Sequence, residues 1–492
     1  MFLQILLIFI LYIVVNFIQK NRKSSSNEPP SAFSIEWPLV GSLFRLGIRP
    51  HQTLTKWAEK SGPIFKFYMG DYKTVCVSDP QMIREIWHIN MDNFHDVPAI
   101  PTMRVVSGDF SNIAMAREYR WRRNRNLCAN TFSKMNLKTT SPPVLNNQCK
   151  LLMKYIDKIY ESGSLFKVQE FMKRYSVNII LEVVFSSKMD YEDKRLDKLI
   201  QLTNQNFVNN QTGNIMDVVS ILQPFYYIWI KYITGVPVDG LKAYMNELLQ
   251  EHKKDLNPEK PRDLYDQIIL DYGDEDVEGI LRLGVDLYLT GVEAGAVAME
   301  WVLLYVTNYP EIQQKVYEEL KKVLADDVDD SDNNGMINLK HRINCPYTLA
   351  VIKEVMRVAP AAVFGLPRIA KEDVEIGGYT VTKGTQVMMN LHSTHHDKRF
   401  YEDPYVFDPN RWLFEDDNNR KANNMAFLPY GVGPRSCIGQ HLSNDFMFIG
   451  ISNILLNYNL TSPNGQNHLI DDTPIFGLTV RSKPFSVKLE KR

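Results

Sequence analysis

Apolar residues recur three and four positions apart through much of the chain, and this spacing predicts helices. The clearest helical patterns lie at residues 51–60, 175–185, 311–324 and 346–358. Patterns typical of strands are confined to one region near the start and to others near the end, at residues 65–78, 374–390 and 476–490. We therefore predict a mainly α fold with a small β region, formed by a single large domain.

The longest helical pattern begins at Val277, behind the candidate N-caps Asp274 and Asp276, and continues until Pro310. A helix of roughly 32 residues is nearly 50 Å long, at about 1.5 Å per residue. Because this one is apolar on most of its circumference, it should run through the core. In its middle, small residues flank Glu293, which we interpret as a place where a ligand lies against the helix beside a carboxylate.

Another apolar run covers residues 2–18 and would form a helix about 26 Å long, close to the thickness of a bilayer core. A cleaved signal peptide is the alternative, but no Lys or Arg precedes this run, and it continues directly into IQKNRK. We predict a single-pass membrane anchor at residues 1–23. Its basic flank, Lys20, Arg22 and Lys23, should keep the following chain on the cytoplasmic side.

Prolines at positions 29, 30 and 38 predict a stiff hinge at residues 24–50, followed by the large domain at residues 51–492. The formal net charge is -1, so the composition gives no indication of a nucleic-acid partner. The chain has 5 widely separated cysteines and no C-x-x-C pair. This pattern disfavours disulfides and a zinc knuckle, and it indicates a reducing compartment such as the cytosol.

One of these cysteines, Cys437, stands between glycines in the segment FLPYGVGPRSCIGQHL, just before a predicted helix. The glycines do not match the dinucleotide-binding fingerprint, because Ser436 stands where that pattern needs a glycine. A metal pair with His441 would supply only two ligands, whereas zinc prefers four. An inert buried thiol is the remaining simple interpretation.

The surroundings of Cys437 favour a metal-bound thiolate. Free N–H groups at the start of the following helix would stabilise the ionised sulfur. Gly433 and Gly439 would let the backbone bend and let a flat cofactor approach closely. Arg435 would pair with a carboxylate of that cofactor. A single thiolate with room on one side is what haem-thiolate chemistry requires.

The segment YGVGPRSCIG resembles the haem-binding signature of the cytochrome P450 family, with Tyr430 at the usual phenylalanine position. Other motifs follow in the family's order and extend over nearly the whole chain. They are WRRNR with Trp121 and Arg125, TGVEAGA in the long helix, EVMR with Glu354 and Arg357, LPR with Arg368, and FDPNRW with Arg411. The resemblance is to the microsomal eukaryotic members, and it implies their fold, with the long helix lying over the haem.

By this resemblance, residues 51–492 form a haem-thiolate catalytic domain, and Cys437 is the iron ligand of haem b, iron protoporphyrin IX. The other residues that the resemblance assigns to cofactor binding are Arg435, Arg368, Trp121, Arg125, Tyr430, Gly433 and Gly439. Glu354, Arg357 and Arg411 would form a structural network behind the haem. Asn410 replaces the glutamate that usually precedes that last arginine.

The long helix departs from the family pattern at one position. Family members usually carry an acid followed by a threonine, whose hydroxyl helps to deliver protons for oxygen–oxygen cleavage. Here Glu293 keeps the acid, but Ala294 replaces the threonine. Losing one well-placed acid–base group typically costs about 10²- to 10⁴-fold in rate. Either Thr290 or the substrate supplies the hydroxyl, or the enzyme rearranges or dehydrates an oxygenated lipid without O2.

We expect a monooxygenase that inserts one oxygen atom from O2 into a hydrophobic small molecule. The resemblance implies an NADPH-dependent cytochrome reductase as electron donor, with cytochrome b5 as a second donor, at the endoplasmic reticulum membrane. The arginines between positions 117 and 125 would dock an acidic donor. The alternatives are the O2-independent rearrangement and a haem protein that only binds a ligand.

The resemblance also predicts which segments line the substrate pocket, namely residues 96–116, 201–212, 361–366 and 475–478. These segments are largely apolar. The aromatic stretch from Val218 to Ile233 is either a second membrane contact or a buried helix. A metal role for His392, His395 and His396 is disfavoured, since the family has a loop near the strands there.

Overall fold

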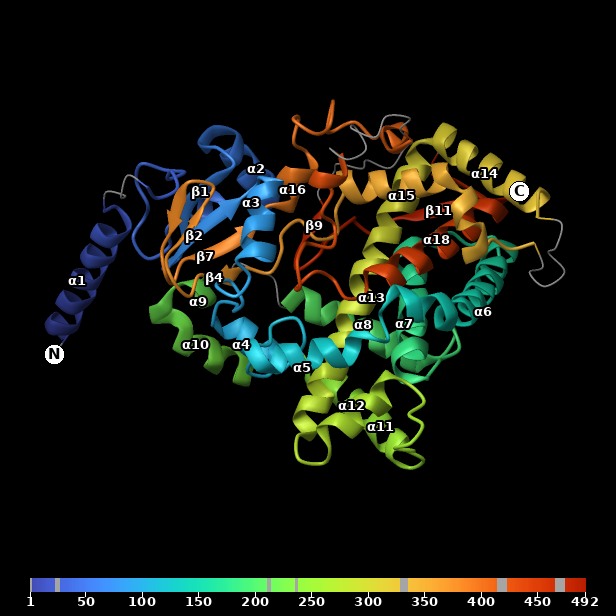
Figure 1. Ribbon diagram of the computed structural model, residues 1–492, viewed down its shortest axis with the longest axis horizontal. Helices are drawn as coiled ribbons and strands as arrows, with labels where there is room; N and C mark the ends of the chain where they lie inside the picture. The colour runs from blue at the N-terminus through green and yellow to red at the C-terminus, as the bar shows by residue number, and fades with distance from the viewer. Residues whose placement is uncertain are drawn as a thin grey trace.

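The computed structural model describes residues 2–22, 27–209, 214–234, 238–327, 335–413, 423–464 and 474–492. Helices form most of the molecule, and the largest sheet lies on the side where the chain begins (Figure 1). The main hydrophobic core lies among the helices, and a second apolar cluster lies against the largest sheet. This arrangement confirms the predicted mainly α fold with a small β region.

The helices that surround the core include all four segments with a clear helical pattern. In chain order the described helices are α1 Phe2–Lys20, α2 Pro50–Ser61, α3 Pro80–Arg84, α4 Pro101–Ser107, α5 Glu118–Ala129, α6 Lys134–Glu161, α7 Val168–Phe185, α8 Lys194–Asn209, α9 Ile215–Val218, α10 Gln223–Trp229, α11 Asp239–Lys253, α12 Leu264–Tyr272, α13 Val277–Asn308, α14 Pro310–Ala325, α15 Pro346–Val358, α16 Leu391–His395 and α18 Gln440–Asn457. The predicted helical segments fall in α2, α7, α14 and α15.

The long helix α13 has the predicted length of 32 residues and runs through the core. Asp276 caps its start by accepting a hydrogen bond from the Gly279 N–H, as the sequence suggested. Among the described helices, α13 is the one long and apolar enough to cross a membrane, but 78% of its apolar window is buried inside the protein. It is therefore a core helix that forms one wall of the site described below.

Within the described residues, the strands form four small sheets. They are β1 Ile64–Met69, β2 Tyr72–Val77, β3 Phe166–Lys167, β4 Arg368–Ile369, β5 Val374–Ile376, β6 Tyr379–Val381, β7 Gln386–Met389, β8 Tyr458–Thr461, β9 Ile475–Phe476, β10 Val480–Arg481 and β11 Ser486–Lys491. The largest sheet has the order β1-β2-β7-β4, in which β2 and β7 run parallel with Thr74 opposite Gln386. This pairing joins the two strand-rich regions, which lie some 300 residues apart along the chain.

The proline-rich segment packs against the domain from residue 28 onward. The Lys66 N–H donates to the Pro30 carbonyl, and the Ala32 N–H donates to the Lys66 carbonyl. Glu28 forms ion pairs with Lys66 and Lys73. Much of the predicted hinge is thus fixed on β1, while the predicted boundary near Ser24 lies outside the described residues.

Helix α1 projects from the side of the molecule that carries β1 and β2 (Figure 1). It is 19 residues long, Phe2–Lys20, and contains the apolar run predicted from the sequence. Most of its apolar side chains are exposed to the surroundings. The membrane anchor therefore stays a prediction, and we return to it below.

Candidate functional site

A cavity of about 1250 Å³ opens beside the middle of α13, and most of the residues around it are apolar. Each of the four segments predicted to line a pocket contributes to its wall. Two further parts of the wall were not predicted from the sequence, namely residues 43–50 and the Asp217–Val218 pair. On α13 itself, Thr290 and Ala294 are exposed although most of the helix is buried, so this part of the helix borders the cavity.

The loop around Cys437 also lines the cavity. It is closed by a hydrogen bond of 2.9 Å from the Cys437 N–H to the Tyr430 carbonyl. Gly433 has φ +74°, and an added Cβ there would lie 2.0 Å from the Trp87 carbonyl oxygen. Gly433 is therefore needed for the bend and for close packing against the Trp87 backbone. This differs from the expected close approach to a cofactor.

Gly439 is different, because an added Cβ there would meet no atom of the described residues within 4 Å. It lines the cavity and forms the N-cap of α18. The backbone at Gly439 consequently leaves room on the cavity side for a bulky group. This is the role that the sequence predicted for it.

The Cys437 sulfur is open to the cavity but enclosed by protein on a larger scale. Its side chain has free surface, yet the residue lies deep among protein atoms. The two observations agree if the free surface faces the cavity rather than bulk water. Burial raises the pKa of the thiol, while the Gly439 N–H and Arg125 act in the opposite direction. The Gly439 N–H therefore favours the ionised sulfur, as expected from the sequence, although burial opposes it.

Three guanidinium groups, those of Arg435, Arg368 and Arg125, lie in the wall of the cavity. Arg435 donates to the carbonyls of His95 and Ala116 and lies over the Trp121 ring, 4.3 Å from its centroid. Arg368 also donates to the His95 carbonyl, and Arg125 donates to the Ser436 carbonyl. The residues named by the motifs are therefore brought together at one place.

These positive charges are poorly compensated by the protein. Burial and the charge of Arg368 lower the pKa of Arg435 to about 8, and burial lowers the pKa of Arg368 to about 10. In the described part of the chain, neither side chain forms an ion pair, and the Nε of each is buried without a hydrogen-bond partner. Asp96 compensates this charge only in part. Such a cluster fits a ligand that carries carboxylates.

His95 belongs to this cluster, although no sequence pattern pointed to it. Its Nδ1 lies 2.9 Å from the Arg435 guanidinium, and its ring packs edge-on against Trp121 at 4.8 Å. Its Nε2 is buried and has no hydrogen-bond partner among the described residues. His95 belongs to no sequence motif, so its contact with Arg435 could not be predicted from the sequence and is seen only in the fold.

The glycines of α13 allow close helix packing. An added Cβ at Gly291 would lie 2.6 Å from Cδ1 of Ile180 on α7. At Gly295 it would lie 2.1 Å from Cζ of Phe446 on α18. Both glycines also line the cavity, together with Ala294, so this stretch of small residues borders the space predicted for a ligand. Of these three residues, Ala294 is the exposed one.

Glu293 lies in the cavity wall but is held by two cations. Its Oε1 lies 2.6 Å from Arg481 on β10, and its Oε2 lies 3.0 Å from Lys173 on α7. The contact with Lys173 is an ion pair but not a hydrogen bond, because Glu293 Oε2 has no hydrogen-bond partner among the described residues. Thr479 also approaches the carboxylate at 3.4 Å. The sequence predicted the acid but not these partners, which come from distant segments.

Two further buried acids lie on α13. Burial raises the pKa of Glu300, two turns after Glu293, to about 8. Asp286, which borders the cavity, accepts hydrogen bonds from the Ile113 and Ala114 N–H groups, both at 2.9 Å. Asp286 thereby fixes the loop before α5 to α13.

The predicted structural network is assembled in the interior. Arg357 donates two hydrogen bonds to Glu354, of 2.9 and 2.7 Å. Arg411 and Trp412 donate to the same carboxylate, each at 2.8 Å. Glu354 thus joins α15 to the segment around Pro409, as the resemblance implied. The asparagine at position 410 takes no part in these bonds with Glu354.

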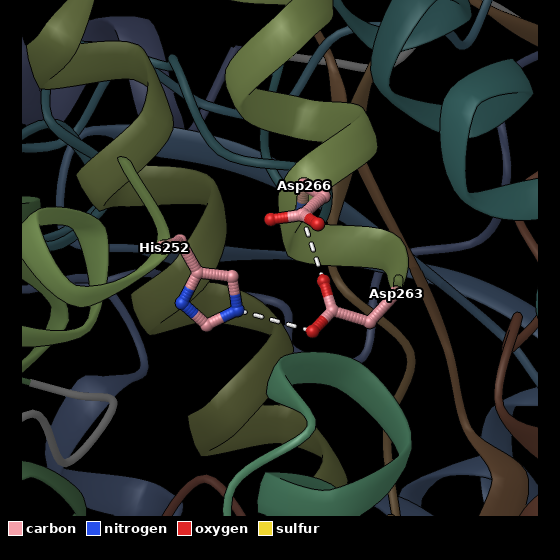
Figure 2. A group of neighbouring side chains, drawn as sticks. All are labelled: His252, Asp263 and Asp266. Carbon is pink, nitrogen blue, oxygen red and sulfur yellow. Dashed lines mark hydrogen bonds and ion pairs between the residues drawn. The ribbon is translucent and has the colours of Figure 1, made fainter. Parts of the chain in front are cut away.

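One histidine–acid group lies apart from the cavity, at α11 and α12 (Figure 2). His252 places one ring nitrogen 2.8 Å from the Leu248 carbonyl and the other 3.0 Å from Asp263. Asp266 is held by Arg262. Both ring nitrogens therefore act as donors, and the group serves as a link between α11 and α12 rather than a metal site. The histidines of α16 are buried and bonded within the protein.

A cysteine open to a large apolar cavity, a long core helix along its wall and a cluster of buried arginines define a haem-thiolate protein. The protein residues fit haem b, whose carboxylates the arginines would hold and whose iron the sulfur would bind. Comparison with known proteins agrees with this class.

The cytochrome P450 family model matches residues 30–489. Probable cytochrome P450 508A1 of Dictyostelium discoideum is 35% identical over 497 residues, covering 99% of this chain and 98% of the relative. Probable cytochrome P450 508C1 of the same organism is 33% identical and covers 99% of both chains. A solved zebrafish cytochrome P450 structure with progesterone has a TM-score of 0.76 at 25% identity, covering 91% of this chain and 100% of that one.

The chain therefore belongs to the cytochrome P450 family. Its members are haem-thiolate monooxygenases, which bind haem b and generally receive electrons from a redox partner. Family membership thus establishes the class of reaction and the cofactor. It leaves the substrate, the donor and the proton supply as questions for the residues of this chain.

Proposed function

We propose that this P450 oxygenates a hydrophobic small molecule at the membrane of the endoplasmic reticulum, with electrons from an NADPH-dependent reductase. The observation that carries the proposal is the single apolar cavity that Cys437, Thr290 and Ala294 all line. Haem bound there supplies the oxygen chemistry. The protein excludes water, orients the substrate and supplies protons.

The supply of protons must work without the usual threonine. The Thr290 hydroxyl donates to the Asp286 carbonyl at 2.7 Å, so its proton is turned toward the helix backbone. To donate into the cavity, this side chain must rotate away from the helix. Glu293 is held in place by its two cations, and burial raises the pKa of Glu300, which favours its protonated form. We propose that water beside Ala294 links these groups to the substrate.

A second function has a specific observation in its favour. The O2-independent rearrangement or dehydration of an oxygenated lipid needs no proton delivery to dioxygen. Ala294 carries no hydroxyl, and that of Thr290 is bonded to the helix. The two functions therefore differ in whether the chain must supply protons at this point of the cavity.

The decisive experiment uses the full-length haem protein with a microsomal reductase. A monooxygenase is reduced by NADPH under anaerobic conditions, and in air it consumes oxygen and forms product in near-equal amounts. A rearrangement enzyme converts a fatty-acid hydroperoxide with no reductant. Conversion of the hydroperoxide alone, with no NADPH-dependent product from a panel of hydrophobic compounds, would replace the first proposal by the second.

The electron donor is expected near α5, but the charge there is weaker than the sequence indicated. Three arginines of the predicted basic cluster are paired with aspartates of neighbouring segments. The pairs are Arg120 with Asp276, Arg122 with Asp92 and Arg123 with Asp271. We still propose the reductase, and cytochrome b5 as second donor, because a redox partner is general in the family. Reductase titrations at increasing salt test whether charge steers this contact.

The membrane part of the proposal is supported by two apolar regions. Helix α1 exposes its apolar side chains over most of its length, and α10 and its neighbours expose Phe225 and Ile228. Both regions lie on the side of the molecule that carries β1 and β2 (Figure 1). We propose a single-pass anchor with the catalytic domain in the cytoplasm and α10 as a second membrane contact. Flotation with vesicles and protease protection of the domain test this topology.

A further inference from the structure

Helix α1 carries a polar stripe that a freely tethered anchor does not need. Tyr12, Asn16 and Lys20 are four residues apart, so they share one face of the helix. Asn16 and Lys20 are only 8% exposed, whereas Val15 and Phe17 beside them are exposed. The end of α1 is therefore packed against the domain along this stripe.

All three side chains meet Asp71, in the tight turn between β1 and β2. Asn16 donates to Asp71 at 2.8 Å, Lys20 lies 3.3 Å away as an ion pair, and the Tyr12 hydroxyl lies at 3.5 Å. The side-chain oxygen of Asn16 also accepts a bond of 2.8 Å from the Leu39 N–H. Asp71 is thus the charged residue of the domain that all three side chains of the anchor helix contact.

The other side of Asp71 contacts the wall of the cavity. The Ser220 N–H donates to its carboxylate at 2.8 Å, and the Asp71 N–H donates to the Val218 carbonyl at 2.8 Å. An added Cβ at Gly70 would lie 2.1 Å from that same carbonyl, so the two backbones are in close contact. Val218 lines the cavity, and the chain continues from Ser220 into α10.

We propose that Asp71 is a clamp that couples the membrane anchor to the cavity wall and thereby fixes how the domain sits in the bilayer. The inference rests on the anchor part of the proposed function. It adds that α1, the Val218–Ser220 turn and α10 move as one unit, so that this part of the cavity wall faces the lipid.

The dimensions of the clamped helix support this orientation. Residues 12–20 lie along the domain, so only residues 2–11 project freely, a length of about 15 Å at about 1.5 Å per residue. That is half of a bilayer core about 30 Å thick. While the clamp is closed, the neighbouring apolar edge must enter the bilayer as well. Phe44, Ile48 and Phe225 on this edge are 63%, 82% and 58% exposed, and the first two line the cavity.

The test compares hydrogen exchange in full-length, haem-loaded protein in phosphatidylcholine nanodiscs. Asp71→Asn keeps the shape of the side chain but removes its charge. We expect the backbone amides of residues 216–222 to exchange about tenfold to hundredfold faster, as for the loss of a charged hydrogen-bond acceptor. Asp274→Asn is the matched control, because Asp274 lies between α12 and α13 with 88% of its side chain exposed. It should leave these amides unchanged.

Lys20→Met tests the coupling from the anchor side. Lys20 forms an ion pair with Asp71. Faster exchange of residues 216–222 in Lys20→Met would therefore show that the change at Lys20 is transmitted through Asp71. Equal exchange in wild type, Asp71→Asn and Lys20→Met would overturn the proposal. Vesicle flotation separates this result from failure of the anchor. If the wild type does not float, the anchor proposal fails, while exchange in detergent micelles still tests the clamp.

Discussion

Arg368 shows what single residues of the site contribute. Its guanidinium is buried beside Arg435, its Nε has no hydrogen-bond partner among the described residues, and its pKa is lowered to about 10. Burying this unpaired positive charge is unfavourable, but a bound carboxylate would compensate it. Arg368 should therefore matter more for the bound cofactor than for the folded chain.

Arg368→Met is expected to weaken haem binding by about tenfold to hundredfold, as for the loss of one charge-assisted hydrogen bond to a carboxylate. Thermal unfolding of the haem-free chain should be unchanged or higher, since one uncompensated buried charge is gone. Haem titration and thermal unfolding measure the two effects. Arg399→Met, at an exposed arginine, is the control. Equal haem affinity in both variants would contradict the assigned role.

Ala294→Thr tests the missing hydroxyl. Because Ala294 faces the cavity, the added hydroxyl should raise the fraction of consumed oxygen that appears in product. The expected change is up to about 10²-fold, the lower end of the effect of one acid–base group. Thr290→Val, whose hydroxyl is bonded to the helix, should change this coupling less. If Thr290→Val abolishes coupling instead, Thr290 is the proton donor.

Motif residues could be predicted one by one, but their partners could not. The segment around Cys437 has a fixed local spacing, so its residues could be named from the sequence. Lys173, Arg481 and His95 lie far along the chain from the groups they contact. No local sequence pattern predicts such pairs, because only tertiary packing brings the two residues into contact.

At the scale of elements, the contacts of α13 depend on glycines. Gly295→Ala would place a methyl group 2.1 Å from Phe446, where α13 and α18 touch. We expect a loss of about 1–3 kcal/mol in the free energy of unfolding, as for overpacking in a core. Gly284→Ala in the same helix is the comparison, since its nearest contact would be 3.1 Å, to Tyr265. Denaturant unfolding should rank Gly295→Ala as the less stable variant, and the reverse order would contradict the packing role.

The link between α11 and α12 predicts a dependence on pH. Burial opposes protonation of His252, but the hydrogen bond and charge of Asp263 outweigh it and raise the pKa. The pair therefore stabilises the fold fully below the unfolded value of about 6.5, and this stabilisation is lost as pH rises through the raised folded value. The advantage of wild type over His252→Gln in urea unfolding should shrink from pH 5.5 to pH 9. An advantage independent of pH would show that the imidazole only fills space.

Elements were more predictable than contacts. The apolar pattern of α13 is continuous and bounded by Asp276 and Pro310, so its length could be read directly. Two-residue strands such as β3 and β4 were not predicted individually, because so short a segment has no period. The glycines of TGVEAGA were predicted to leave space for a ligand, but the sequence did not reveal that they also pack closely against Ile180 and Phe446.

At the scale of the whole molecule, the sequence indicated the order of the anchor, the hinge and the domain. It did not indicate how they contact one another. An apolar run and a set of prolines predicted an anchor and a hinge as separate units. The structure instead fixes residues 28–32 on β1 and the end of α1 on Asp71. Asp71 is a single acid in a tight turn, and only the assembled sheet shows what it contacts.

The buried arginines of the cavity have a further consequence for the cell. A newly made chain must bring these like charges together before cofactor can offset their repulsion. A ligand that binds only the folded state stabilises it in proportion to the logarithm of its free concentration. The abundance of this protein should therefore follow the iron and porphyrin supply, with chains made during shortage unfolding and being degraded first.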